Sequence, residues 1–203
     1  MIELTAALAL LFLTHLVPSS PGVRQACIGM LGLRGFRIVY SAVSLGVVAW
    51  LIVAYINAAG APWLWTPPEW GRWVAVAVMP VALWLIAARL MQRSGAVRTG
   101  IYRLVPAPGS AGLLLWSLLH LLNVGHARAI MLFGVFAAIS AVAAIKNTMT
   151  APPVAPSDAS PGAAPVSATP LWKPAVAALV AWAALLALHP YVIGVDPLAA
   201  ILP

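Results

Sequence analysis

The stretch SAGLLLWSLLHLLNVGHAR, residues 110–128, decides the fold. It is an apolar segment, and His120 is the ionisable residue expected to lie inside the membrane. A charge inside lipid costs at least about 2.5 kcal/mol, so an ionisable residue there usually faces a cavity, a partner or a cofactor. A second histidine of this kind, His15, lies near the inner end of the first apolar segment. The central question is therefore whether these two histidines meet.

Composition places the chain in a membrane. Of its 203 residues, 63% are hydrophobic and 7% are charged, which leaves too few charges to cover a soluble globule. The formal charge of +7 comes from basic residues in short loops, as the positive-inside rule expects, so nucleic acid is not an expected partner. The single cysteine, Cys27, excludes an intramolecular disulfide and a metal cluster built from cysteines. The first segment carries Glu3 and no basic n-region, which favours a retained helix over a signal peptide.

The apolar segments predict an all-α fold, a polytopic membrane helix bundle of about six transmembrane helices. The segments are about residues 2–17, 38–58, 74–90, 110–124, 127–145 and 173–188. Pro18 is expected to end the first segment, and Ser110 is a candidate cap of the fourth. Pro80 is expected to kink the third or to open backbone groups that a neighbour must satisfy. Residues 18–37 are expected to form a loop.

The same pattern predicts three parts: a five-helix membrane core over residues 1–148, an Ala/Pro/Ser linker over 149–172, and a C-terminal transmembrane helix with its tail over 173–203. The linker composition cannot bury a core. Most Lys and Arg residues lie in the first, third and fifth loops. These loops are therefore expected on the cytoplasmic side, with the N-terminus and the C-terminus outside.

Two histidines on different membrane helices can hold a haem by its axial positions. His120 lies about 15 Å into its helix and His15 about one turn from the inner end of the first helix, so a shared ligand needs tilted helices or a longer first helix. For either histidine alone, an interhelical hydrogen bond explains the sequence equally well. His126 and His189, at the outer ends of their segments, are expected to be solvated or to face headgroups.

Acid–base, nucleophilic and transport chemistry find little support. The four carboxylates lie outside the spans or at their ends, so no buried pair is expected. The serines of the apolar helices have no neighbouring base and are expected to hydrogen-bond to their own helix; they are Ser41, Ser44, Ser117 and Ser140. The two halves do not repeat, which disfavours a transporter.

Three blocks of sequence carry a resemblance to a known family. They are THLVPSSPGVRQACIGMLGLRGFRIVYSAVSL (14–45), TGIYRLVPAPGSAGLLLWSLLHLLNVG (99–125) and LHPYVIGVDPL (188–198). Together they resemble the NnrU family of bacterial membrane proteins, and the first two are similar to the zeta-carotene isomerase of plants, a haem b membrane enzyme. The resemblance implies that His15 and His120 are the metal ligands of a haem b. Such a pocket would be lined by Trp116, Leu118, Leu119 and Leu121.

The resemblance also implies a function. It implies a multi-pass protein of the bacterial inner membrane, linked to nitrite and nitric oxide metabolism in denitrification, with a redox partner or a reductase complex as its partner. Two alternatives stay open: a redox-gated cis–trans isomerase of a polyene such as zeta-carotene, and a cofactor-free accessory subunit of a respiratory complex. The sequence does not decide whether the protein is an enzyme.

The chain departs from the family pattern at two sites, Ser117 and the stretch from Pro106 to Pro108. Ser117 stands where the isomerase has a cysteine three residues before its second ligand, so a ligand switch to that cysteine is not available. Pro106, Ala107 and Pro108 stand where the family usually reads Arg-His-Pro. That motif helps to bind the methyl donor in membrane isoprenylcysteine methyltransferases, so its loss argues against methyl transfer.

Overall fold

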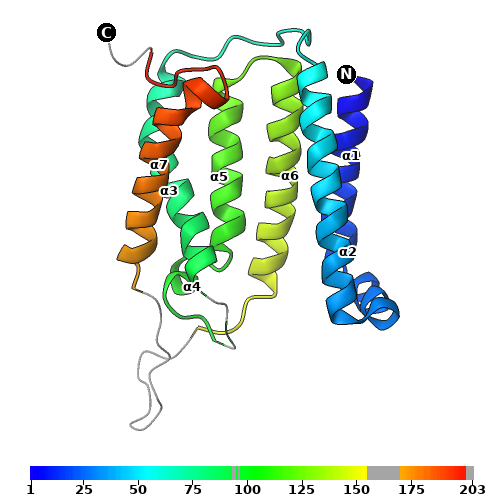
Figure 1. Ribbon diagram of the computed structural model, residues 1–203. Helices are drawn as coiled ribbons and strands as arrows, with labels where there is room; N and C mark the ends of the chain where they lie inside the picture. The colour runs from blue at the N-terminus through cyan, green and yellow to red at the C-terminus, as the bar shows by residue number, and fades with distance from the viewer. Residues whose placement is uncertain (93–94, 96, 155–169, 200–203) are drawn as a thin grey trace. The chain divides into compact units, whose positions relative to one another are not determined.

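The structure, a computed structural model, describes residues 1–92, 95, 97–154 and 170–199. Within these ranges the regular elements are all helical, as predicted (Figure 1). They are α1 (Ile2–Leu16), the short 3₁₀ helix η1 (Val17–Ser19), α2 (Pro21–Asn57), α3 (Trp70–Met91), α4 (Ile101–Leu104), α5 (Pro108–Asn123), α6 (Ala127–Met149) and α7 (Trp172–Val192).

Five helices are long and apolar enough to cross a membrane. They are α1 with η1, α2, α3, α6 and α7, and each matches a segment expected from the sequence. The prediction of a polytopic helical membrane bundle is therefore confirmed. α5 has 16 residues and is shorter than the roughly 20 residues that a full span requires.

The ends of α5 show that it nevertheless covers the length of α3. At one end, the Asn123 side-chain amide donates a hydrogen bond to the Gly71 carbonyl (3.1 Å). At the other end, the stem of Arg89 passes over Gly109, where a Cβ atom would come within 2.6 Å of the Arg89 Cγ. α3 and α5 are thus an antiparallel pair that contact each other near both ends of α5.

The chain forms two compact units, each described here by itself. The first consists of Met1–Thr66 and Val124–Val135. Its α1 packs on α2 through buried residues spaced three and four apart, as expected of a helix face; these are Leu4, Ala7, Leu8 and Leu11 on α1 and Val47, Leu51 and Ala54 on α2. At the outer end of the pair, the Glu3 carboxylate accepts hydrogen bonds from Trp50 Nε1 (3.2 Å) and Asn57 Nδ2 (3.3 Å).

The second unit consists of Pro67–Asn123 and Phe136–Pro203. Its core contains Leu85, Ala88, Ile101 and Tyr102. Gln92 connects α3 to α4, because its side-chain oxygen accepts from the Ile101 amide (3.3 Å) and its carbonyl accepts from the Tyr102 hydroxyl (3.2 Å). The four-residue helix α4 is therefore held against the inner end of α3.

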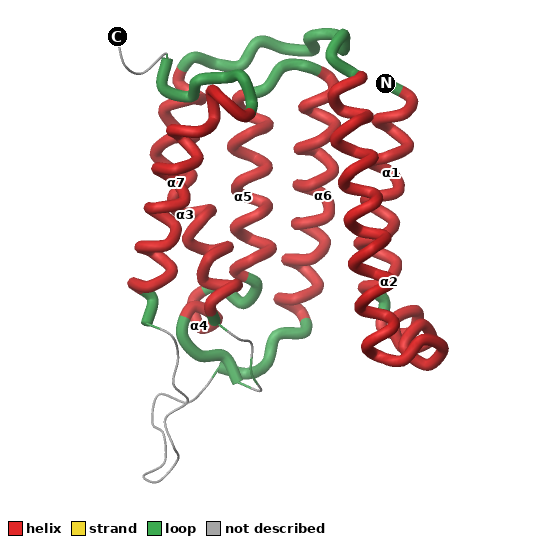
Figure 2. The backbone as a smooth tube through the Cα atoms, in the orientation of Figure 1, coloured by secondary structure: helices red, strands yellow, loops and turns green. Residues whose placement is uncertain are grey.

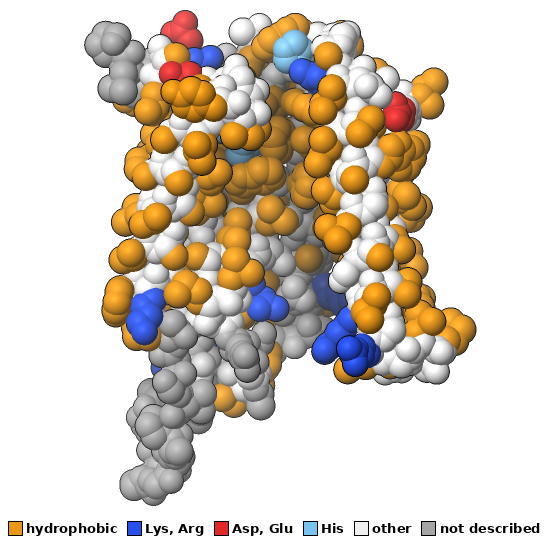
Figure 3. Space-filling view, viewed as in Figure 1, with side chains coloured by type: hydrophobic (Ala, Val, Ile, Leu, Met, Phe, Trp, Pro, Cys, Tyr) orange, Lys and Arg blue, Asp and Glu red, His pale blue; other side chains and the backbone are white. Residues whose placement is uncertain are grey.

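Two short bridges join loops within the units. Trp63, in the second loop, pairs with His126 in the fourth, and Arg98, in the third loop, pairs with Val154 in the fifth. Because paired loops lie on the same side of the membrane, the second and fourth loops share a side, and so do the third and fifth loops. Blue Lys and Arg side chains gather at the lower ends of the helices, whereas the red carboxylates lie at the upper ends beside a few further basic side chains (Figure 3).

The prediction of a loop over residues 18–37 is wrong for most of its length. α2 begins at Pro21, and the chain stays helical up to Gly32, which has φ 69° and ψ 164°. There it turns sharply and continues as the span (Figure 2). Proline is favoured in the first turn of a helix because its missing N–H is not needed there, and Ser20 before it is extended.

Two smaller expectations concern the start of α5 and the linker. Ser110 is not a cap, because α5 begins two residues earlier at Pro108, again a proline at a helix start; the Ser110 hydroxyl instead accepts a hydrogen bond from Asn147 Nδ2 (3.5 Å). The expected linker begins where α6 ends at Met149, and α7 begins at Trp172. Its middle, residues 155–169, lies outside the described residues.

Candidate functional site

His120 lies in the last turn of α5, inside the second unit. Its Nδ1 lies 2.8 Å from the Trp116 carbonyl oxygen. A carbonyl can only accept, so Nδ1 carries the proton, and Nε2 carries the lone pair that a metal could take. The imidazole also packs on the Trp116 ring, with 4.4 Å between centroids, and Trp116 in turn meets the edge of Phe136 at 6.0 Å.

The side chains predicted to line a pocket at His120 differ in exposure. Leu119 is buried, whereas Leu118 is 49% exposed and therefore points away from the interior of its unit. Ser117 is fully buried, and its hydroxyl donates to the Leu113 carbonyl (2.8 Å), which confirms the expected bond to its own helix. The buried hydroxyl oxygens of Ser44 and Ser140 have no such partner among the described residues.

His15 lies in the last turn of α1, in the first unit. Its Nδ1 lies 2.9 Å from the Leu11 carbonyl oxygen, so this ring has the same tautomer as His120, with the lone pair on Nε2. The helical path continues beyond α1 as η1 up to Ser19, which is further than the sequence predicted and places His15 more than one turn from the end of the span.

An open apolar groove runs along the face of α1 that leads to His15. α1 lines it at helical spacing, with Thr5, Leu8, Ala9, Phe12 and Leu13, and α6 with Met131, Gly134 and Val135. The groove belongs to the first unit and has a volume of about 530 Å³. His15 follows Phe12 by three residues, so the two are neighbours along the helix. The sequence analysis missed this groove, although the recurrence of residues 5, 8 and 12 was a signal for one helix face.

His126 is more enclosed than the sequence suggested. Its ring packs on Trp63 with 4.0 Å between centroids, and its buried Nδ1 has no partner among the described residues. Nearby in the chain, Arg128 donates to the Tyr55 carbonyl (3.2 Å) and its guanidinium lies 4.8 Å from the Tyr55 ring centroid. His126 is half-buried and joins the second and fourth loops, so the expectation that it faces water or headgroups stays a prediction.

His189 belongs to the same unit as His120. It lies in the last turn of α7, and its Nδ1 is 2.7 Å from the Val195 carbonyl oxygen, which gives it the same tautomer as His15 and His120. His189 is therefore included in the test of ligand identity.

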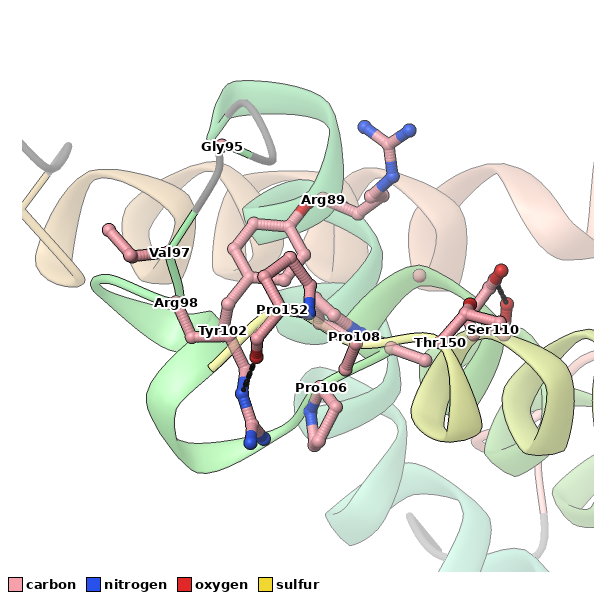
Figure 4. Close-up of a pocket in the computed structure, with 14 residues that line it drawn as sticks. Arg89, Gly95, Val97, Arg98, Tyr102, Pro106, Pro108, Ser110, Thr150 and Pro152 are labelled. Atoms are coloured by element: carbon pink, nitrogen blue, oxygen red, sulfur yellow. Dashed lines mark hydrogen bonds between the residues drawn. The ribbon is translucent and has the colours of Figure 1, made fainter. Parts of the chain in front are cut away.

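A pocket of about 200 Å³ lies at the inner end of the second unit (Figure 4). Its lining includes Pro106, Ala107 and Pro108, the positions that depart from the family pattern, together with Arg89 and Arg98. The two guanidinium groups point in different directions (Figure 4), and the Arg98 Nε donates to the Pro152 carbonyl (2.8 Å). Among the described residues the lining has no carboxylate, histidine or cysteine, and its hydroxyl groups belong to Tyr102, Ser110 and Thr150.

The described residues contain no cluster of three or more His, Cys, Asp or Glu side chains that could hold a metal ion. A haem needs only one or two axial ligands from the protein, because its macrocycle supplies the other four. The donor set of His15 and His120 fits that demand: each is an imidazole whose Nδ1 is held by a backbone carbonyl, as is usual for metal-ligating histidines. The His15 ring belongs to the first unit and the His120 ring to the second.

Long apolar helices joined by short basic loops define the chain as a multi-span helical membrane protein. The family model described as NnrU protein matches residues 3–197. The chain therefore belongs to the NnrU family, as the three sequence blocks predicted. No curated protein and no solved structure matches it.

Proposed function

We propose that the protein binds haem b in the bacterial inner membrane, with His15 and His120 as the axial ligands. The observation that carries the proposal is the shared tautomer: Nδ1 of each ring donates to a carbonyl of its own helix, which directs the lone pair of Nε2 away from the backbone. Metal-ligating histidines usually have their other ring nitrogen held by a carbonyl in this way, and an ionisable residue inside an apolar helix is costly unless it serves such a role.

The residues of the chain would hold and shield the cofactor. The two imidazoles would fix the iron, and the apolar faces of α1 and α5 would keep water away, which tunes the redox potential of a haem. When bound, haem b supplies one-electron transfer and the binding of small gases such as nitric oxide. The link to nitrite and nitric oxide metabolism is part of this proposal and rests on family membership.

Haem content is the direct test. We would express the protein with added haem precursor, purify it in detergent and measure haem per polypeptide for the wild type and for His15→Ala, His120→Ala, His126→Ala and His189→Ala. We expect haem to be lost in the first two variants. We expect it to be kept in His126→Ala, because the native His126 ring packs against Trp63. Equal haem content in His120→Ala and His126→Ala would contradict the proposal. Loss in His120→Ala and His189→Ala, with His15→Ala unchanged, would move the second ligand to α7.

The groove on α1 favours one second candidate. The side chains that line it are apolar except for Thr5, which suits an elongated apolar ligand. We therefore also propose, as the alternative, a redox-gated isomerase of a polyene that binds there. Expression in carotenoid-producing cells tests this directly, because isomerisation would change the pigment profile, and Gly134→Leu, which fills the groove, should abolish the change. An unchanged profile with haem-loaded protein would leave electron transfer or gas binding as the function. A colourless wild type would favour the cofactor-free accessory subunit.

A further inference from the structure

The first part of α2, residues 21–31, is a helical arm that leaves the span at Gly32. The Gly32 φ of 69° lies in the left-handed region, and its ψ of 164° makes this a conformation that only glycine adopts readily. The arm is turned away from the axis of the α2 span (Figure 1). Because the span crosses the bilayer, a helix that turns off its inner end runs along the membrane surface.

The arm has an apolar side and a polar side. At 100° per residue, Val23, Cys27 and Met30 fall on one face, and Met30 is 78% exposed. Arg24 and Gln25 fall on the other side, with Ile28 between them. An amphipathic helix with low overall hydrophobicity and basic residues on its polar face is the type that lies in a membrane interface.

The distance of the arm from the hydrocarbon layer fits that location. The apolar part of the α2 span begins at about Ile38, six residues after Gly32, which is about 9 Å along a helix. The headgroup region on each side of a bilayer is about 5–8 Å thick. The arm therefore leaves the span at the level where headgroups meet water, and the exposed side chains of Met30 and Leu31 can reach the acyl chains.

The charge around the turn is entirely positive. Arg24, Arg34 and Arg37 lie there, and the sequence has no Asp or Glu between residues 4 and 68. The Arg24 guanidinium lies 5.9 Å from the centroid of Phe36, and Phe36 stacks on Tyr40 at 5.9 Å, so this arginine links the arm to the start of the span. Blue side chains gather beside apolar ones at the lower end of α2 (Figure 3).

We propose that the arm is an interfacial helix that binds the headgroups of anionic phospholipids in the cytoplasmic leaflet. Val23 and Met30 enter the acyl boundary, and the three arginines bind phosphate. Guanidinium groups match phosphate geometry by paired hydrogen bonds, and clusters of basic residues next to a transmembrane helix attract anionic lipid. A protein partner is less suited to this face, because the apolar strip is one helix wide and adjoins the bilayer.

Spin labels can measure the depth of each face, since Cys27 is the single cysteine. In a Cys27→Ala background, labels at Met30→Cys and Gln25→Cys would be compared in full-length protein in nanodiscs with phosphatidylglycerol. We expect the Met30 label to collide with oxygen and not with a water-soluble nickel chelate, and the Gln25 label to show the reverse. A Met30 label open to the nickel chelate, or shielded from both reagents as in a protein interface, would overturn the proposal.

A charge variant tests the lipid itself. The triple variant Arg24→Gln/Arg34→Gln/Arg37→Gln should bind phosphatidylglycerol about fivefold more weakly per arginine removed. The matched control Arg89→Gln/Arg103→Gln/Lys173→Gln removes the same charge from the second unit. Bound phosphatidylglycerol would be counted by mass spectrometry after delipidation. Equal retention by the two triple variants would overturn the assignment of the arginines to anionic lipid.

Discussion

At the scale of single residues, Gly112 decides how closely α3 and α5 approach. A Cβ atom at this position would lie 2.6 Å from the Ala82 carbonyl oxygen and 2.9 Å from the Leu85 Cβ. Both atoms belong to the facing helix and cannot move aside cheaply. We therefore expect Gly112→Ala to destabilise the second unit by about 1–3 kcal/mol, the usual range for overpacking. Thermal unfolding in detergent, followed by size-exclusion chromatography, measures the change.

Gly46→Ala is the matched control for this variant. Gly46 also lies within a membrane helix, but a Cβ there would meet nothing within 4 Å. Its melting temperature should equal that of the wild type or exceed it slightly, because alanine is the better helix former. If Gly112→Ala melts at the same temperature as Gly46→Ala, the two helices are not packed as closely as described.

The candidate site was predictable from the sequence only as a set of residues. The cost of an ionisable group in lipid singled out His15 and His120, and the structure adds that both rings share one tautomer. The contact of His126 with Trp63 could not be predicted, because it depends on the pairing of loops 63 residues apart in the chain. The exposure of Leu118 likewise depends on which side of α5 faces its neighbours. A segment that is apolar all round does not reveal that side.

At the scale of elements, the turn at Gly32 should control the arm. We expect Gly32→Ala to cost about 1–3 kcal/mol if the chain keeps this backbone conformation. Since a Cβ at Gly32 meets nothing within 4 Å, the strain can be relieved by a change of the arm angle without loss of core packing. The expected result is a Met30→Cys label that leaves the acyl region, with an unchanged melting temperature.

Gly29→Ala provides the control for the turn. Gly29 lies in the same arm, has nothing within 4 Å of a Cβ position, and has no positive φ. This variant should leave the label depth as in the wild type. A label depth that is the same in Gly32→Ala and Gly29→Ala would show that the arm is held by something other than the glycine turn.

Helices were the most predictable elements, and the arm was the least. The apolar segments gave five of the spans to within a few residues at most ends, because length and hydropathy alone define a membrane helix. Gly22, Gly29 and Gly32 are poor helix formers, so residues 18–37 resembled a loop in sequence. The arm forms despite them, and a membrane surface that takes up its apolar face would explain why.

At the scale of the whole molecule, the distribution of basic residues predicts which loops face the cytoplasm. In a Cys27→Ala background, Gly60→Cys should react with an impermeant maleimide in intact spheroplasts, because it lies exposed in the second loop. Gln25→Cys, in the arm, should react only after lysis. The excess of Arg and Lys on the first, third and fifth loops is the physical reason. Reaction of Gln25→Cys in intact spheroplasts, with Gly60→Cys protected, would reverse the orientation.

The sequence predicted the sides of the loops but not their pairing. Charge alone assigns Arg98 and the start of the fifth loop to the cytoplasm, whereas the hydrogen bond from the Arg98 amide to the Pro153 carbonyl (2.9 Å) depends on how α3 and α6 end. The division into two units is also beyond sequence analysis, because it cuts α6 between Val135 and Phe136. No change of composition marks that boundary.

The central claim, a haem b held by two histidines, is tested most directly by the absorption spectrum of the purified protein. We would record it oxidised and then reduced with dithionite, for the wild type, His15→Ala and His120→Ala. The account predicts the sharp reduced bands of a low-spin b-type haem in the wild type, and their loss or a change to a high-spin spectrum in both variants. A wild type that stays colourless when expressed with ample haem, or a low-spin spectrum unchanged in both variants, would contradict it.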